Sequence, residues 1–246
     1  IDNLKAVAAK NPALLKDSVI KGTVNNDMEP LKKAGLKGLE KVMMASHTNM
    51  TAGEFNAAVK NWVDTARDKR FQQPFTSLVY QPMIELLKYL RANQFRTFIV
   101  SGGGADFMRV WTEQVYGIPP NQVIGSYGEI SFKDVNGKPV IFKSAGDIFL
   151  DDKASKPVAI YRFIGQVPVF CGGNSDGDQA MMEYTSTSKY NTLCVLLHHT
   201  DADREYAYDA KALSGQLVTA LEKAKEKNWM VVDMKNDFKK IFPFEK

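Results

Sequence analysis

The chain has 246 residues, of which 44% are hydrophobic and 24% are charged. This composition is typical of a globular protein and excludes collagen-like, coiled-coil and largely disordered chains. The net charge of +4 comes from 32 basic and 28 acidic residues that are well mixed along the chain, so it does not indicate binding to nucleic acid. The longest apolar run is about five residues, far short of the roughly 20 that span a membrane. We therefore expect a soluble protein of the cytoplasm or periplasm, and the composition does not decide between the two.

Helical patterns fill the first part of the chain. Apolar residues recur there at helical spacing. Thr51, followed three residues later by Glu54, forms a capping box that predicts the start of a helix. The sequence therefore predicts a helical domain over residues 1–80.

The second part of the chain alternates between strand and helix patterns. Asn136-Gly137 predicts a hairpin turn within an inserted segment at about 123–150. The predicted strands are 97–100, 167–171, 193–197 and 229–232, and the predicted helices are 105–116, 157–164, 179–185 and 207–227. This alternation favours an α/β domain over 81–246, with a parallel sheet covered by helices on both faces. Ligands bind such sheets at the carboxyl ends of the strands.

The first polar loop at a strand end is Ser101-Gly102-Gly103-Gly104. A hydroxyl and unencumbered backbone N–H groups at the start of a helix form an anion site. The loop lacks the Gly-Lys-Ser/Thr of a nucleotide-binding P-loop. Phe107 stands where the dinucleotide fingerprint needs glycine. The alternative interpretation is a tight turn between a strand and a helix.

A second loop, Asn174-Ser175-Asp176-Gly177-Asp178, follows the strand predicted at 167–171. Clustered carboxylate and amide oxygens suit a hard cation such as Mg²⁺. An EF-hand calcium loop is excluded, because Gln179 and Thr185 stand where it needs glycine and glutamate. The alternative is a helix start stabilised by acidic residues.

Further candidates are weaker. Lys156 precedes Pro157 at a predicted helix start, where its ammonium could reach a bound phosphoryl group, whereas Lys153 is the less well placed lysine of the same loop. For either one, the alternative is an exposed loop lysine. The run 198–203, with two histidines and two aspartates, fits an active-site rim or a solvated loop better than a transition-metal site. The two cysteines are predicted to be buried thiols.

Three features, taken in chain order, resemble motifs II, III and IV of the haloacid dehalogenase (HAD) superfamily. They are the Ser101 loop, Lys156 and the loop 174–178. The chain is most similar to its phosphoserine-phosphatase-like phosphohydrolases, over residues 82–200. The resemblance implies a Rossmann-like three-layer α/β core with a parallel sheet, a helical cap over 1–80 and a β-hairpin insertion at about 123–150.

The resemblance also implies an activity. The protein would be a Mg²⁺-dependent phosphatase that hydrolyses small phosphate monoesters through an aspartyl-phosphate intermediate. Ser101 and Lys156 would be catalytic and, with Gly102 and Gly103, would bind the phosphoryl group. The Mg²⁺ ligands would be Asn174, Asp176 and Asp178.

The sequence departs from this family at the nucleophile. The pattern Asp-x-Asp-x-Thr/Val after an apolar strand does not occur in the 246 residues. We therefore expect the nucleophilic aspartate and the central strand in an N-terminal segment of about 50 or more residues upstream of Ile1. The alternatives are a catalytically inactive phosphate-binding or regulatory protein, or another HAD hydrolase or phosphotransferase.

Overall fold

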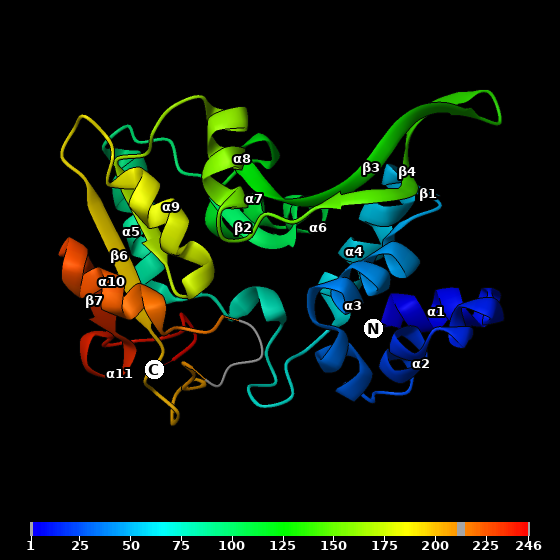
Figure 1. Cartoon of the computed structure of the whole chain (residues 1–246), viewed down its shortest axis with the longest axis horizontal. Helices are drawn as coiled ribbons and strands as arrows, with labels where there is room; N and C mark the ends of the chain where they lie inside the picture. The colour runs from blue at the N-terminus through cyan, green and yellow to red at the C-terminus, as the bar shows by residue number, and fades with distance from the viewer. Residues whose placement is uncertain (1, 211–214, 246) are drawn as a thin grey trace. The chain divides into compact units, whose positions relative to one another are not determined.

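The computed structural model describes residues 2–210 and 215–245, which form a mixed α/β structure (Figure 1). The chain divides into two compact units. Unit 1 consists of Ile1–Trp62 and Tyr127–Phe149, and unit 2 consists of Val63–Ser126 and Leu150–Lys246. The units thus divide the chain at residues 62, 126 and 149, where the sequence predicted one division near residue 80.

Unit 1 combines helices with a β-hairpin. Its elements are α1 (Asp2–Lys10), η1 (Pro12–Lys16), α2 (Ser18–Val24), α3 (Glu29–His47), β1 (Met50–Thr51), most of α4 (Ala52–Thr65), the distal part of β3 (Val123–Val135), and β4 (Lys138–Phe149). The capping box predicted at the start of α4 is present, because the Thr51 N–H donates to Glu54 Oε2 and the Glu54 N–H donates to Thr51 Oγ1.

The hairpin of unit 1 forms where the sequence predicted it. Val135 pairs with Lys138 across the turn. Asn136 and Gly137 adopt φ angles of 55° and 77°, as a type I′ turn requires. The turn type therefore sets the register of this long ribbon.

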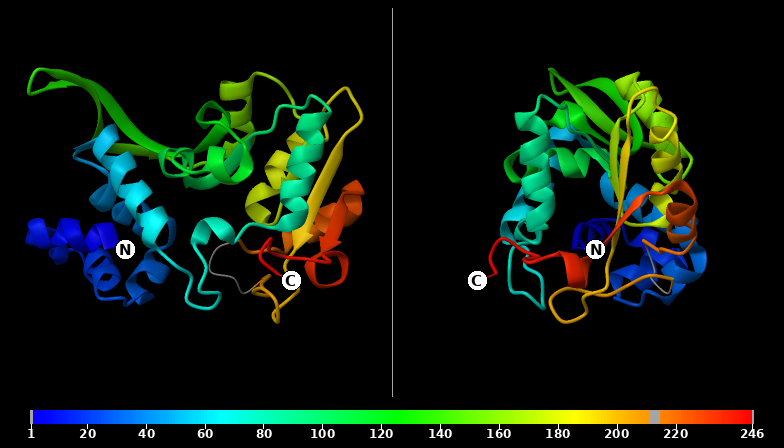
Figure 2. Two further views of the ribbon diagram at one scale, coloured as in Figure 1. Left: turned by 180° about the vertical axis from the view of Figure 1, so that it is seen from behind. Right: turned by 90° about the vertical axis from the view of Figure 1, so that its left-hand side faces the viewer.

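Unit 2 carries the alternating strands and helices. Its elements are η2 (Phe75–Ser77), α5 (Gln81–Ala92), β2 (Ile99–Gly104), α6 (Ala105–Arg109), α7 (Thr112–Tyr116), η3 (Pro120–Gln122), the first residues of β3, α8 (Ser155–Ile164), β5 (Phe170–Gly173), η4 (Asp176–Asp178), α9 (Gln179–Thr185), β6 (Leu193–His198), α10 (Thr219–Lys227), β7 (Met230–Asp233) and α11 (Met234–Asp237). In unit 2, α5 lies on one side of β6 and α9 on the other (Figure 2).

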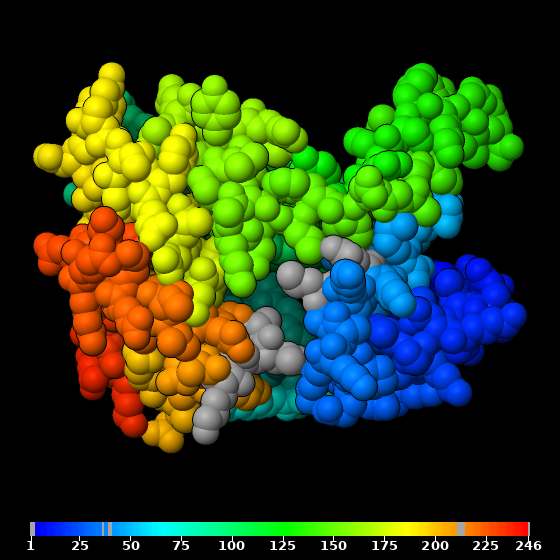
Figure 3. Space-filling model, in the orientation of Figure 1, coloured from blue at the N-terminus to red at the C-terminus, as the bar shows by residue number. Residues whose placement is uncertain are grey.

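The strands of unit 2 pair in parallel but not in one sheet. β2 pairs with β3, and β5, β6 and β7 form a separate three-stranded sheet in that order. Its core packs Ile160, Met182, Leu196 and Leu217 together at 2% exposure or less. α9 and α10 cover this core side by side on the face seen in Figure 3. The single three-layer sheet and the helical cap remain predictions.

Two predicted helices differ from the structure. The helix predicted over 105–116 is two short helices, α6 and α7. The helix predicted over 207–227 is wrong in its first part. Its helical structure begins only at Thr219, because Tyr208 forms a β-bridge with His199 and Gly215 has a φ angle of 73°. Residues 211–214 of that prediction lie outside the described residues. No helix in the described ranges combines the length and apolar character needed to cross a bilayer.

Candidate functional site

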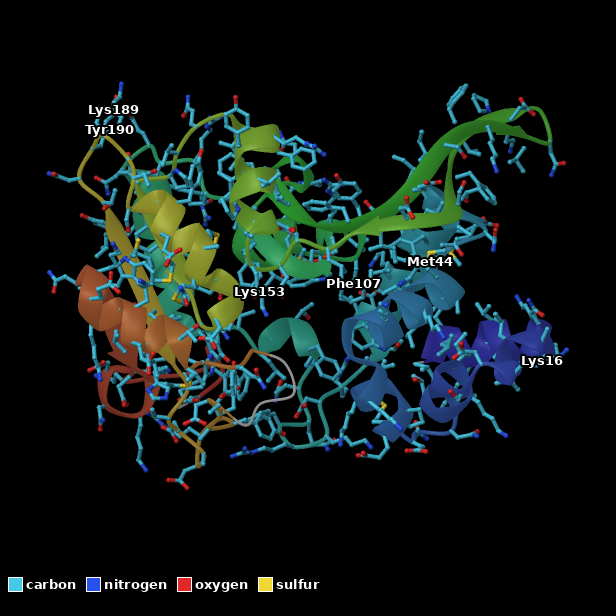
Figure 4. All side chains as sticks on the ribbon, in the orientation of Figure 1. Lys16, Met44, Phe107, Lys153, Lys189 and Tyr190 are labelled. Carbon is cyan, nitrogen blue, oxygen red and sulfur yellow. The ribbon has the colours of Figure 1, made fainter. Side chains whose placement is uncertain are left out.

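Lys156 joins two of the loops that the sequence singled out. It lies in the first turn of α8 and is 5% exposed. Its Nζ donates to the Val100 carbonyl oxygen of β2 at 2.9 Å and lies 2.9 Å from Asp178 Oδ1. Lys153, by contrast, is an exposed residue of the loop that precedes α8 (Figure 4). The buried ammonium therefore connects the Val100 backbone of β2 to the loop that follows β5.

Further backbone contacts hold the loop at 151–156 against both neighbouring loops. The Ser126 hydroxyl donates to the Gly102 carbonyl oxygen at 2.7 Å and accepts from the Asp151 N–H at 3.0 Å. The Lys153 N–H donates to the Gly177 carbonyl oxygen at 3.1 Å. A Cβ at position 177 would lie 2.4 Å from Asp152 Oδ1, so a larger residue there would have to displace the Asp152 side chain. The three loops predicted to carry the chemistry thus lie together in unit 2.

Residues Ser101–Gly104, predicted as a loop after a strand at 97–100, form the last four residues of β2 and combine a hydroxyl with exposed backbone. Gly102 and Gly103 are exposed, and β2 is irregular between Ser101 and Gly104. The Ser101 Oγ accepts a hydrogen bond from the Gly103 N–H at 3.1 Å, which leaves the hydroxyl proton for another acceptor. This arrangement suits an anion.

Asp178 uses both carboxylate oxygens within the protein. Oδ1 pairs with Lys156, and Oδ2 accepts from the N–H groups of Asn174 and Ser175 and from the Ser175 hydroxyl, at 2.9 to 3.1 Å. Ser175 and Asp178 together form a capping box on η4. The carboxylate therefore organises its own loop and fixes Lys156.

Asp176 and Asn174 also bond to neighbouring segments. Asp176 Oδ1 accepts from the N–H groups of Val218 and Ala220, both at 2.9 Å, and so caps α10. Burial acts to raise the pKa of the Asp176 carboxyl, but these backbone donors bring it below its usual value. The Asn174 Nδ2 donates to the Tyr208 hydroxyl at 3.2 Å.

These contacts bear on the predicted Mg²⁺ site. Within residues 2–210 and 215–245, no group of three His, Cys, Asp or Glu side chains is placed to hold a metal ion. The carboxylates of Asp176 and Asp178 both accept hydrogen bonds from the chain itself. Mg²⁺ binding by Asn174, Asp176 and Asp178 remains a prediction.

Asp151 is a site residue that sequence reasoning missed. Its side chain is fully buried, and neither carboxyl oxygen has a hydrogen-bond partner among the described residues. Burial raises the pKa of this carboxyl to about 6, although the Lys156 charge offsets part of the rise. In the sequence, Asp151 is one of two adjacent aspartates in a loop, and nothing there separates it from its exposed neighbours.

The polar run at 198–203 makes contacts within the chain itself, and the two cysteines are buried. His199 Nδ1 lies 3.3 Å from Glu205 Oε2, and its ring stacks on that of Tyr208. Asp201 pairs with Arg204 at 2.6 Å. The two cysteines are free and buried, as predicted.

Comparisons with known proteins show only weak structural similarity. No family model matches the chain, and no curated protein matches it. The chain is similar to the crystal structure of a phosphoserine phosphohydrolase-like protein from Francisella tularensis subsp. tularensis SCHU S4, with a TM-score of 0.42 and 14% sequence identity over 90% of this chain and 89% of that chain. Similarity at this level does not indicate an activity for this chain. The proposed function therefore rests on the contacts described above.

Proposed function

We propose that this protein is a hydrolase of small phosphate monoesters. One observation carries the proposal. The buried Lys156 ammonium lies between the Val100 carbonyl oxygen of β2 and Asp178, and the Ser101 segment with its exposed glycines directly follows Val100 in the chain. A fixed positive charge near a free hydroxyl proton and an exposed glycine backbone is an arrangement that stabilises a transferring phosphoryl group.

In the proposed reaction, an aspartate carboxylate oxygen attacks phosphorus and the bond from phosphorus to the ester oxygen breaks. The second aspartate of the Asp-x-Asp pattern gives a proton to the leaving alcohol and then takes one from the water that hydrolyses the aspartyl-phosphate, which releases inorganic phosphate. We assign the nucleophile to a segment upstream of Ile1. Ser101 would donate its hydroxyl proton to a phosphoryl oxygen, Gly102 and Gly103 would approach the group with their backbone, and Lys156 would offset its charge.

Magnesium dependence is a separate part of the proposal. Asn174, Asp176 and Asp178 are the predicted ligands, and a bound Mg²⁺ would offset charge on the phosphoryl oxygens. Asp178 uses both carboxylate oxygens within the chain, whereas Asp176 accepts its two backbone hydrogen bonds on Oδ1, so its Oδ2 can reach a metal ion without giving up those partners. A chelator tests the Mg²⁺ dependence directly.

A catalytically inactive phosphate-binding protein is the second candidate. It is favoured by the sequence itself, because the 246 residues contain no Asp-x-Asp-x-Thr/Val nucleophile pattern. This candidate shares the anion site and differs only in turnover.

Hydrolysis of an aryl phosphate by the natural full-length protein, with Mg²⁺ present, distinguishes the two candidates. We expect turnover that is lost with a chelator. Lys156→Ala and Ser101→Ala should each lower turnover by about 10² or more, as expected for loss of a group that stabilises transition-state charge. Lys153→Ala, the matched control, should leave turnover unchanged. No turnover with the wild-type protein, or an equal loss in Lys153→Ala, would contradict the proposed enzyme.

A further inference from the structure

Unit 1 contains a groove of about 1070 Å³ among its helices. The elements α1, η1, α2, α3, β1, α4 and β4 all contribute residues to it, so the groove belongs to this unit alone. Its wall is largely apolar and includes Val7, Leu14, Ile20, Met44 and Met50, of which Met44 is labelled in Figure 4. Methionine side chains are flexible and adapt to the shape of an apolar ligand. The groove therefore suits an aliphatic chain.

One face of α3 gives the groove both apolar and positively charged residues. Lys37, Lys41, Met44 and Ala45 all line it. These positions recur at spacings of three and four residues, which places them side by side on one face of a helix. The apolar wall and two ammonium groups thus come from the same helix face.

Two polar side chains in the lining are already bonded within the chain. The Thr48 hydroxyl donates to the Met44 carbonyl oxygen at 2.6 Å. Glu54 Oε2 accepts from the Thr51 N–H at 2.7 Å and from the Thr51 hydroxyl at 2.8 Å. Because these groups have partners, they do not require a polar ligand in the groove.

The charged groups around the groove do not balance. Lys10 and Lys37 line it, are exposed, and form no hydrogen bond or ion pair within the described part of the chain. Lys41 pairs with Asp17 at 2.6 Å. Among the described side chains, these three lysines face the charges of Asp17 and Glu54, which leaves one positive charge. An apolar groove with one uncompensated positive charge complements a ligand that has an aliphatic tail and a single negative charge.

We propose that this groove binds a medium-chain aliphatic carboxylate. The hydrocarbon chain lies along the apolar wall, and the carboxylate lies at the exposed ammonium groups of Lys10 and Lys37. A carboxylate carries the single charge that balances the groove, whereas a phosphate monoester carries nearly two. The inference rests on unit 1 alone and does not depend on the phosphatase proposal.

Titration of octanoate into the 246-residue chain, followed by methionine methyl NMR shifts, provides the first test. The methyl groups of Met44 and Met50 should shift saturably, whereas that of Met43, which does not line the groove, should not. The uncharged 1-octanol should bind about tenfold more weakly, because it forms no ion pair with the two lysines. Octylammonium, with the same tail and a positive charge, should bind more weakly still. No saturable shift up to about 10 mM octanoate, or equal affinity for all three compounds, would overturn the inference.

Two pairs of variants provide the second test. Changing both lysines, Lys10→Gln with Lys37→Gln, should weaken octanoate binding about tenfold. Lys33→Gln, at an exposed position of α3 outside the groove, should leave it unchanged. Ala58→Phe fills the groove and should abolish binding, whereas Ala57→Phe changes the neighbouring exposed residue outside it and should not. Thermal unfolding checks that each variant is folded. Unchanged binding in the double lysine variant, or equal losses in the two phenylalanine variants, would overturn the inference.

Discussion

Two neighbouring loops of unit 2 use their acidic residues in opposite ways. In the loop 174–178, Asp176 caps α10 and Asp178 accepts three hydrogen bonds while pairing with Lys156. In the loop 151–156, Asp151 is equally buried and its carboxyl oxygens have no partner among the described residues. A cluster of acids in sequence therefore marks where loops meet, but it does not identify the carboxyl group that is left unsatisfied.

The largest expected effect comes from breaking the ion pair that links these loops. Lys156→Met should lower the free energy of unfolding by about 3 to 5 kcal/mol, because it leaves the buried Asp178 carboxylate without its cation. Urea unfolding at neutral pH measures this loss. Lys153→Met changes an exposed lysine of the same loop and should stay within about 0.5 kcal/mol of the wild type.

A double variant separates lost charge pairing from lost packing. Adding Asp178→Asn to Lys156→Met removes the unpaired charge but keeps an acceptor for the Asn174 N–H. Part of the stability should return. If the double variant is less stable than Lys156→Met alone, the stranded carboxylate is not the cause of the loss.

The next effect concerns Asp151 and depends on pH. Its pKa is about 6 in the folded protein, against 3.8 as the ordinary value, so the folded state holds the proton more tightly. Stability is therefore lost as the pH rises from about 4 to above 6. Asp151→Asn removes this loss and should raise the free energy of unfolding by about 3 kcal/mol at pH 8, with little change at pH 4. Urea unfolding at the two pH values tests this, and a gain of equal size at both would contradict the assigned cause.

A smaller effect distinguishes capping from metal binding at Asp176. Asp176→Ala removes the acceptor for two N–H groups at the start of α10 and should cost about 1 to 2 kcal/mol in unfolding free energy without any metal present. Asp176→Asn keeps an oxygen acceptor and should cost less. Thermal unfolding in chelator compares the two variants. Equal stability of Asp176→Ala and wild type would show that the cap contributes nothing.

Local signals in the sequence predicted much of the fold. Asn136-Gly137 marked the hairpin turn, and the helix at 179–185 has the predicted bounds. Lys156 was favoured over Lys153 because it precedes Pro157 at a helix start, and it is the buried lysine of the two. Such signals act between residues that are close in the chain, which is why a single sequence shows them.

Features that depend on distant contacts could not be predicted. The start of α10 depends on the pairing of Tyr208 with His199 and on the cap from Asp176, which lies about 40 residues away in the chain. The burial of Asp151 and the separation of the parallel strands into two sheets are likewise tertiary properties. Hydrophobic periodicity carries no information about either.

The central claim is that the end of β2 (Ser101–Gly104), the loop before α8 and the loop after β5 form one site for a phosphoryl group. Titration of inorganic phosphate into the 246-residue chain, followed by backbone amide NMR shifts, tests it most directly. We expect saturable shifts at Gly102 and Gly103 together with residues 174–178, and their loss in Lys156→Met checked to be folded. Shifts that are absent from Gly102 and Gly103, or that persist unchanged in that variant, would contradict the account.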